Sequence, residues 1–232
     1  MEIAFIVFTI LALSLPLLCM SVQVRRDKFG RPIVGETKYR LLWVDIETTG
    51  LDPEKCAPLE IGMFMTDTLL TMVSPPTVFV INPGEYYLHR MNEFVREMHK
   101  KSGLAELVRT EANPLSVPQA DARCYAYIRE NRGDATDLVL AGSGCHFDDL
   151  WLTKWFPLVK GELHYRHVNV SMFKVLLGKD ATSPAHRSLA DLEYSVGLLR
   201  EVMATYRAGL KHVSVLESKP DPLERSLGHI QE

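Results

Sequence analysis

Short runs of apolar residues, separated by polar turns, predict a mixed sheet of five strands in the middle of the chain. Residues 40–46 (RLLWVDI) are rich in strand-forming residues and lead into Thr-Thr-Gly, which predicts a buried strand that enters a turn. The other predicted strands have a similar composition: residues 59–67, 77–82, 137–142 and 167–170. The first three strands follow one another before any long helix, so they form a meander.

Apolar positions three and four residues apart predict the helices. The clearest helix covers residues 185–208, and its apolar positions lie on one face: Leu189, Leu192, Val196, Leu199 and Met203. Further helices are predicted at residues 88–110 (with a break at Ser102-Gly103), 121–131 and 148–156. Residues 209–232 are mostly polar and predict a loosely held tail. A sheet flanked by helices indicates a single α/β or α+β domain.

The beginning of the chain has a different pattern. Residues 3–20 form a run of eighteen residues without a charge, and at a rise of about 1.5 Å per residue such a helix nearly spans a hydrocarbon core of about 30 Å. Basic residues follow in the linker 22–39, so the positive-inside rule places the rest of the chain in the cytoplasm. We therefore expect residues 1–21 to be a hydrophobic membrane anchor. The alternatives are a cytoplasmic protein translated from Met20, a buried terminal helix or a cleaved signal.

Charge and composition exclude several classes of protein. The 232 residues include 26 Lys and Arg against 29 Asp and Glu, a net charge of −3, which argues against a protein that coats long duplexes. Hydrophobic residues at 47% and charged residues at 24% are typical of a globular protein. The 4 cysteines are widely spaced, so neither a disulfide scaffold nor a zinc finger is expected.

Acidic residues at the predicted ends of elements are the candidate chemistry. Asp45 and Glu47 lie two apart on a strand, so both carboxylates point to one face and repel each other unless a cation or a proton lies between them. Asp148 and Asp149 begin a predicted helix. His186 and Asp191 lie at the start of the long helix, and Asp191 is off its apolar stripe. Each feature alone has an ordinary explanation, such as a polar strand end or a solvated histidine.

Together, the ordered set Asp-x-Glu, Asp and His-x4-Asp resembles the DEDDh exonucleases of the ribonuclease-H-like fold. More narrowly, residues 41–207 resemble the oligoribonucleases, through the segments WVDIETTGLDP (43–53), MNEFVREMHKKSGL (91–104), HYRHVNVS (164–171) and AHRSLADLEYSVGLL (185–199). Aligning AGSGCHFDDLWL (141–152) on the family's third motif selects Asp148 rather than Asp149. The chain departs from the family pattern at four positions: Thr48 for Met, Phe94 for Trp, Gly144 for Ser and Asn169 for Asp.

This resemblance implies a fold, an activity and a set of site residues. The fold is α/β, a ribonuclease-H-like mixed five-stranded sheet flanked by helices over residues 40–208, here preceded by the N-terminal hydrophobic helix. The implied activity is 3′→5′ hydrolysis of short single-stranded RNA to 5′-mononucleotides with two metal ions. The implied ligands of two Mg²⁺ or Mn²⁺ ions are Asp45, Glu47, Asp148 and Asp191. His186 would take the proton of the attacking water.

The resemblance also implies substrate contacts and a partner. Leu51 and Phe94 would pack against the bases at the 3′ end of the RNA. The implied cap on the 5′ phosphate is made by Ser143, Arg166 and Ser171. Tyr165 would come from the partner subunit, so a homodimer is expected.

Two other functions stay open from the sequence. One is a DEDDh exonuclease that acts on DNA or on longer RNA, as a proofreading or trimming enzyme does. The other is a membrane-tethered nucleic-acid-binding module without catalysis, which the complete set of acids and the histidine disfavours.

Overall fold

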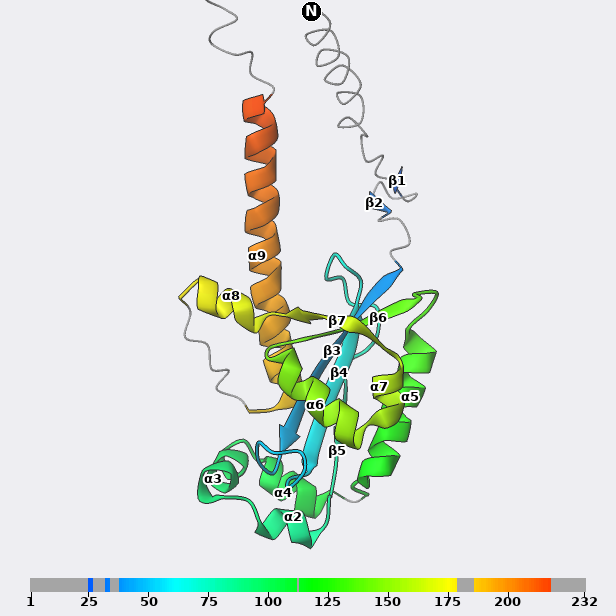
Figure 1. Cartoon of the computed structure of the whole chain (residues 1–232), viewed down its shortest axis with the longest axis vertical. Coiled ribbons are helices and arrows are strands. Elements are labelled where there is room, and N and C mark those ends of the chain that lie inside the picture. The colour runs from blue at the N-terminus through cyan, green and yellow to red at the C-terminus, as the bar shows by residue number, and fades with distance from the viewer. Residues whose placement is uncertain (1–24, 27–31, 34–37, 112, 179–185, 218–232) are drawn as a thin grey trace, which may run out of the picture. The chain divides into compact units, whose positions relative to one another are not determined.

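The computed structural model describes residues 25–26, 32–33, 38–111, 113–178 and 186–217 (Figure 1). The chain divides into two units, Met1–Thr37 and Lys38–Glu232. In the first unit, the strands β1 (Arg25–Arg26) and β2 (Pro32–Ile33) pair antiparallel, inside the segment predicted to be a linker.

The second unit is built on a mixed sheet of five strands, as predicted. Its strands are β3 (Tyr39–Thr48), β4 (Pro58–Thr66), β5 (Thr77–Val80), β6 (Asp137–Gly142) and β7 (Leu163–Asn169). They lie in the order β5-β4-β3-β6-β7. β3, β4 and β5 form the antiparallel meander, whereas β6 runs parallel to β3 and β7 runs parallel to β6. β3 is thus a central strand with neighbours on both sides.

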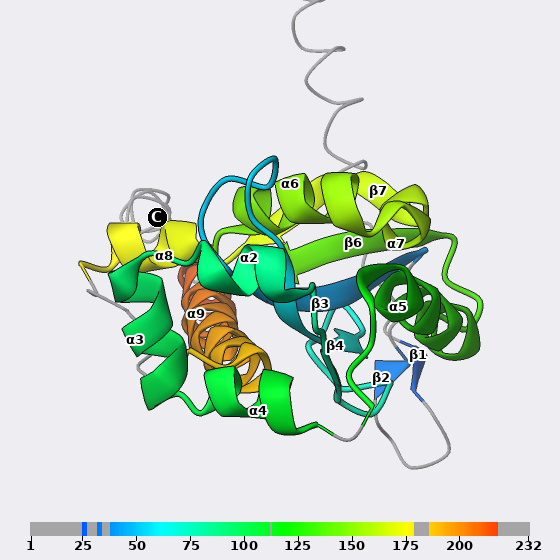
Figure 2. The same cartoon turned by 90° about the horizontal axis from the view of Figure 1, so that it is seen from below.

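Helices cover both faces of this sheet. Alternate residues of β3 point to opposite faces, and both sets include buried apolar side chains. The helices are α2 (Glu85–His89), α3 (Glu93–Lys101), α4 (Leu104–Thr110), α5 (Val117–Asn131), α6 (Cys145–Trp155), α7 (Pro157–Gly161), α8 (Ser171–Leu176) and α9 (Ser188–Glu217). Leu42 and Val44 of β3 pack in a core with α5, α6 and α7, and Leu41 and Trp43 pack in a second core with α9. Accordingly, α5 and α9 lie on opposite sides of the sheet (Figure 2).

Several boundaries differ from the predicted ones for local reasons. α5 begins at Val117 rather than at residue 121, because Pro118 suits a first helical turn and the Gln119 side chain accepts the Ser116 N–H at 2.9 Å. α6 begins at Cys145, directly after Gly144. β7 begins at Leu163 rather than at residue 167, and its exposed middle explains why no alternation marks it. α9 continues to Glu217 instead of ending at residue 208, since no proline lies between residue 208 and Pro220.

The prediction of a membrane-anchored protein needs correction. Among the residues that the structure describes, no helix is both long and apolar enough to cross a bilayer. Residues 3–20, where the N-terminal hydrophobic helix was predicted, lie outside the described residues. The structure therefore gives no support to a transmembrane helix or to a localisation based on one.

Candidate active site

Two carboxylates project from β3 close to the end of that strand. Asp45 and Glu47 share the face on which Leu41 and Trp43 contact α9, and they pair across the strands with Gly62 and Glu60 of β4. Burial, together with the neighbouring carboxylates, raises the pKa of Asp45 to about 7 and that of Glu47 to about 8. Both groups therefore hold protons that ordinary carboxyls lose at neutral pH.

A third carboxylate comes from the first turn of α6. Asp148 is buried and accepts the backbone N–H of Ile46, and burial and the nearby Asp45 raise its pKa well above the ordinary value. Asp149 makes different contacts: it pairs with Lys160, and its Oδ1 lies 3.6 Å from His167 Nε2. The structure thus brings Asp148, and not Asp149, to the acids of β3.

The start of α9 supplies the remaining two predicted residues. One ligand atom each of Glu47, His186 and Asp191 lie within 4.8 Å of one another. The charge of Asp191 also raises the pKa of both Asp45 and Glu47. The four acids Asp45, Glu47, Asp148 and Asp191, called the acidic cluster below, therefore meet beside His186.

The donor set of the acidic cluster fits a divalent cation. Carboxylate oxygens are the ligands that Mg²⁺ and Mn²⁺ prefer, and no thiol belongs to the group that the structure brings together. The acids are buried against one another at a cost that a cation would offset, as their raised pKa values show.

A cavity of about 410 Å³ opens next to His186 and has Phe94 in its wall. Its other lining residues come from α3 and the turn after it: Glu93, Glu97, Met98, Lys101 and Ser102. The Phe94 side chain is 76% exposed, and Leu51, in the loop between β3 and β4, is 82% exposed. Both large apolar side chains are open to solvent, where a ligand can reach them.

The predicted cap residues do not all lie together. Ser143 follows β6, and Ser171 begins α8. Arg166 Nη1 donates to the hydroxyl of Tyr39 at 3.0 Å, and Tyr39 begins β3 whereas Asp45 and Glu47 lie near the end of that strand. The Tyr165 ring is 77% exposed, with the Arg166 guanidinium 5.2 Å from its centre. Within one chain, the structure does not bring Tyr165 and Arg166 to the acidic cluster.

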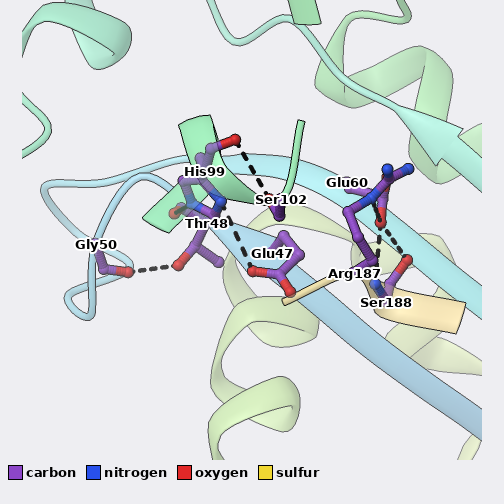
Figure 3. A network of polar contacts seen from close by, with 8 residues as sticks. All are labelled: Glu47, Thr48, Gly50, Glu60, His99, Ser102, Arg187 and Ser188. Atoms are coloured by element: carbon purple, nitrogen blue, oxygen red, sulfur yellow. Dashed lines mark hydrogen bonds and ion pairs between the residues drawn. The ribbon is translucent and has the colours of Figure 1, made fainter. Parts of the chain in front are cut away.

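Two buried residues beside the cluster are absent from the predicted site (Figure 3). His99 Nε2 donates to the Thr48 carbonyl at 2.8 Å, and its Nδ1 lies 4.0 Å from Glu47 Oε2. Burial lowers the pKa of His99, so its ring is neutral at pH 7. Glu60 is fully buried in β4 and accepts hydrogen bonds from Arg187 and Ser188. The sequence carries a signal for each residue. His99 follows Val95 by four residues on the buried side of α3, and Glu60 is an acid inside an apolar strand.

The chain is similar to known proteins of one family. A family model described as Exonuclease (RNase_T) matches residues 42–115. The probable oligoribonuclease of Dictyostelium discoideum is 33% identical over 184 residues, which cover 76% of this chain and 95% of that protein. The chain belongs to the oligoribonuclease family. The oligoribonuclease of Leifsonia xyli is 35% identical over 166 residues, covering 68% of this chain and 79% of that protein.

Solved structures confirm the predicted mixed five-stranded sheet flanked by helices. A zinc-bound complex of E. coli exonuclease I with single-stranded DNA matches with a TM-score of 0.56 at 15% identity, over 77% of this chain and 43% of that one. This chain thus spans less than half of exonuclease I, and at this identity the likeness concerns the fold alone. The protein is a nuclease with the exonuclease fold.

Two departures from the oligoribonuclease pattern have local explanations. Asn169 Oδ1 accepts the N–H groups of Gly144 at 2.9 Å and Ser171 at 3.1 Å, and the Ser171 hydroxyl at 2.7 Å. An amide oxygen does here what a carboxylate oxygen could do, and it joins the turn that holds Ser143 to the start of α8. Gly144 has a φ of 93°, a left-handed conformation that favours glycine over serine.

Proposed function

We propose that this protein is a 3′→5′ exoribonuclease that hydrolyses short single-stranded RNA to 5′-mononucleotides. The observation that carries the proposal is the meeting of the acidic cluster with His186, from three elements far apart in the sequence. Membership of the oligoribonuclease family supports RNA of a few nucleotides as the substrate.

The acidic cluster is proposed to hold two divalent ions, Mg²⁺ or Mn²⁺. When bound, such ions neutralise the charge on the attacking and leaving oxygens of a phosphodiester. Asp45 and Glu47 come from a central strand of the sheet, and Asp148 is fixed by the Ile46 N–H. Carboxylates attached to rigid elements of the fold are held in place for catalysis.

His186 is proposed to be the general base. It belongs to the group with Glu47 and Asp191 and also lines the cavity, so it could reach both a bound substrate and an attacking water. A neutral imidazole can accept the proton of a water molecule on its free ring nitrogen, and the nearby acids would stabilise the positive charge that results.

The cavity beside His186 is proposed to take the base at the 3′ end of the RNA. The exposed ring of Phe94 offers a stacking surface that tolerates any base, and Leu51 offers a second apolar contact. Ser143 and Ser171 are proposed to cap the 5′ phosphate, because Asn169 joins Gly144, the residue after Ser143, to Ser171. A short distance between the cap and the acidic cluster would limit the length of the substrate.

A homodimer is proposed to complete the site. Tyr165 and Arg166 lie away from the acidic cluster of their own chain, so a role for them in the site requires a second subunit. Exposed apolar side chains on the adjacent α8 support contact with a second copy: Met172, Val175 and Leu176.

The proposal is tested by digesting labelled RNA of two to twenty nucleotides, and DNA of the same sequences, with Mg²⁺ or Mn²⁺. We expect dinucleotides to be hydrolysed fastest, by about tenfold or more over the longest RNA, because losing one charge-assisted contact to the 5′ phosphate costs about that much. Equal rates on DNA, or faster rates on the longest RNA, would instead favour an exonuclease of the proofreading or trimming type. No hydrolysis of any substrate would leave only a binding module.

A further inference from the structure

His186, the proposed general base, lies in a backbone conformation that needs support. His186 has a φ of 45°, in the left-handed region that non-glycine residues seldom adopt. It precedes α9, which begins at Ser188, so the helical hydrogen bonds of α9 do not hold it. A strained residue persists at a functional site only where its surroundings fix it.

The two residues after His186 are both fastened to one buried carboxylate. Arg187 Nη2 donates to Glu60 Oε2 at 2.8 Å, and its Nε lies 3.2 Å and 3.1 Å from the two Glu60 oxygens. Ser188 donates its backbone N–H at 3.0 Å and its hydroxyl at 2.7 Å to Glu60 Oε1. These contacts of Glu60, Arg187 and Ser188, called the Glu60 clamp below, join the start of α9 to β4 (Figure 3).

The neighbouring position on β4 makes room for this clamp. Gly62 lies opposite Asp45 in the strand pairing and on the same face as Glu60. A Cβ atom at position 62 would lie 2.5 Å from Ser188 Oγ and 2.7 Å from Ser188 Cβ. The missing side chain therefore lets the start of α9 approach the sheet directly beside the acidic cluster.

We infer that Glu60 is a positioning residue for the general base: by holding Arg187 and Ser188, it fixes the backbone of His186 against the acidic cluster. This inference rests on the proposed role of His186. Asp191 depends less on the clamp, because it lies within α9 next to Leu192, and α9 is packed in the core through Leu192 and Val196. Loss of the clamp therefore affects the histidine more than the ion site.

The test measures kcat and KM for an RNA dinucleotide, Mn²⁺ affinity by calorimetry, and the His186 ring signals by NMR, all on the full chain. Glu60→Gln keeps an acceptor for Ser188 but turns an amide N–H₂ toward the Arg187 guanidinium. We expect kcat to fall about 10- to 100-fold, the loss that misplacing a reacting group by about 1 Å produces. KM and Mn²⁺ affinity should stay within about threefold, and the His186 signals should broaden or split.

Two further variants separate geometry from charge. Gly62→Ala changes no charge but collides with Ser188, and it should reproduce the loss of kcat. The double variant Glu60→Gln/Arg187→Gln restores a donor–acceptor pair without charges, and it should recover at least about fivefold of the lost kcat. The matched control is Tyr127→Phe on α5, which removes a buried hydroxyl bonded to the Pro75 carbonyl at 2.7 Å and should lower Tm without changing kcat.

The outcomes separate this inference from the proposed function. Unchanged kcat and unchanged His186 signals in Glu60→Gln and Gly62→Ala would overturn it, and so would a loss of Mn²⁺ affinity as large as the loss of kcat. If the wild-type protein did not hydrolyse the dinucleotide, the proposed function would fail. The His186 signals would then still decide whether Glu60 holds this residue.

Discussion

Replacing Asp148 with asparagine is expected to abolish hydrolysis while making the metal-free protein more stable. Asn keeps an oxygen that can accept the Ile46 N–H, so the start of α6 stays in place. It removes one negative charge from the acidic cluster, and this weakens the affinity of the cluster for a divalent ion. We expect kcat/KM on short RNA to fall by more than about 10³-fold, at least the cost of losing one donor that stabilises transition-state charge.

The gain in stability follows from the raised pKa values. An acid with a higher pKa in the folded state binds its proton more tightly when folded, so the free energy of unfolding falls as pH rises through that range. For Asp45 and Glu47 the range runs from the ordinary values of 3.8 and 4.5 to about 7 and about 8. At pH 8 without metal, Asp148→Asn should raise Tm by a few degrees, since about 1 kcal/mol moves Tm by roughly 2–4 °C in domains of this size. The gain should shrink at pH 5, where Asp45 and Glu47 of the wild-type protein are protonated.

Asp149→Asn is the matched control for this prediction. It makes the same chemical change one residue later, where the side chain pairs with Lys160 and His167 instead of the acidic cluster. Activity should stay within a few-fold of wild type, because the Asp149 side chain makes its contacts away from the acidic cluster. Equal losses of activity in Asp148→Asn and Asp149→Asn would show that the assignment of Asp148 is wrong.

Replacing His186 with asparagine is expected to separate the general base from the ion ligands. Asn tolerates the left-handed backbone at this position better than alanine, so the variant tests the imidazole and not the strain. Loss of a general base lowers kcat by about 10²- to 10⁴-fold. Mn²⁺ affinity, measured by calorimetry, should stay within a few-fold, because the four carboxylates remain.

His186→Gly serves as the companion variant. Glycine relieves the strain at a φ of 45° but also lacks a base, so it should be as inactive as His186→Asn. If either variant lost Mn²⁺ affinity together with activity, His186 would be an ion ligand. The geometry also allows this role, because one ligand atom each of Glu47, His186 and Asp191 lie within 4.8 Å of one another.

The sequence predicted the sheet well because its central strands are buried. β3, β4 and β6 are apolar runs that end at turns, and a run of that kind is visible without knowledge of its neighbours. β7 is an edge strand with an exposed middle, so only its last residues carried a strand signal. The end of α9 was placed too early because polarity alone does not end a helix.

The metal-binding candidates can be named from the sequence because they lie in short motifs with a recognisable spacing. The residues that support them lie outside these motifs and were not predicted. His99 contacts Glu47 and Thr48 across about fifty residues of chain, and Glu60 contacts Arg187 across more than a hundred. Contacts between residues so far apart in the sequence form only in the folded sheet, so the spacing of residues along the chain does not reveal them. Tyr165 and Arg166 lie away from the acidic cluster of their own chain, and the spacing of their motif alone does not predict this.

The central claim is that the acidic cluster removes nucleotides from the 3′ end of short RNA with the help of divalent ions. The most direct measurement follows a 5′-labelled RNA trinucleotide over time, with wild type and Asp148→Asn, in Mn²⁺ and in a chelator. We expect the label to pass through the dinucleotide to the mononucleotide, for wild type with Mn²⁺ only. Release of labelled mononucleotide without a dinucleotide stage, or equal hydrolysis by Asp148→Asn or in the chelator, would contradict the claim.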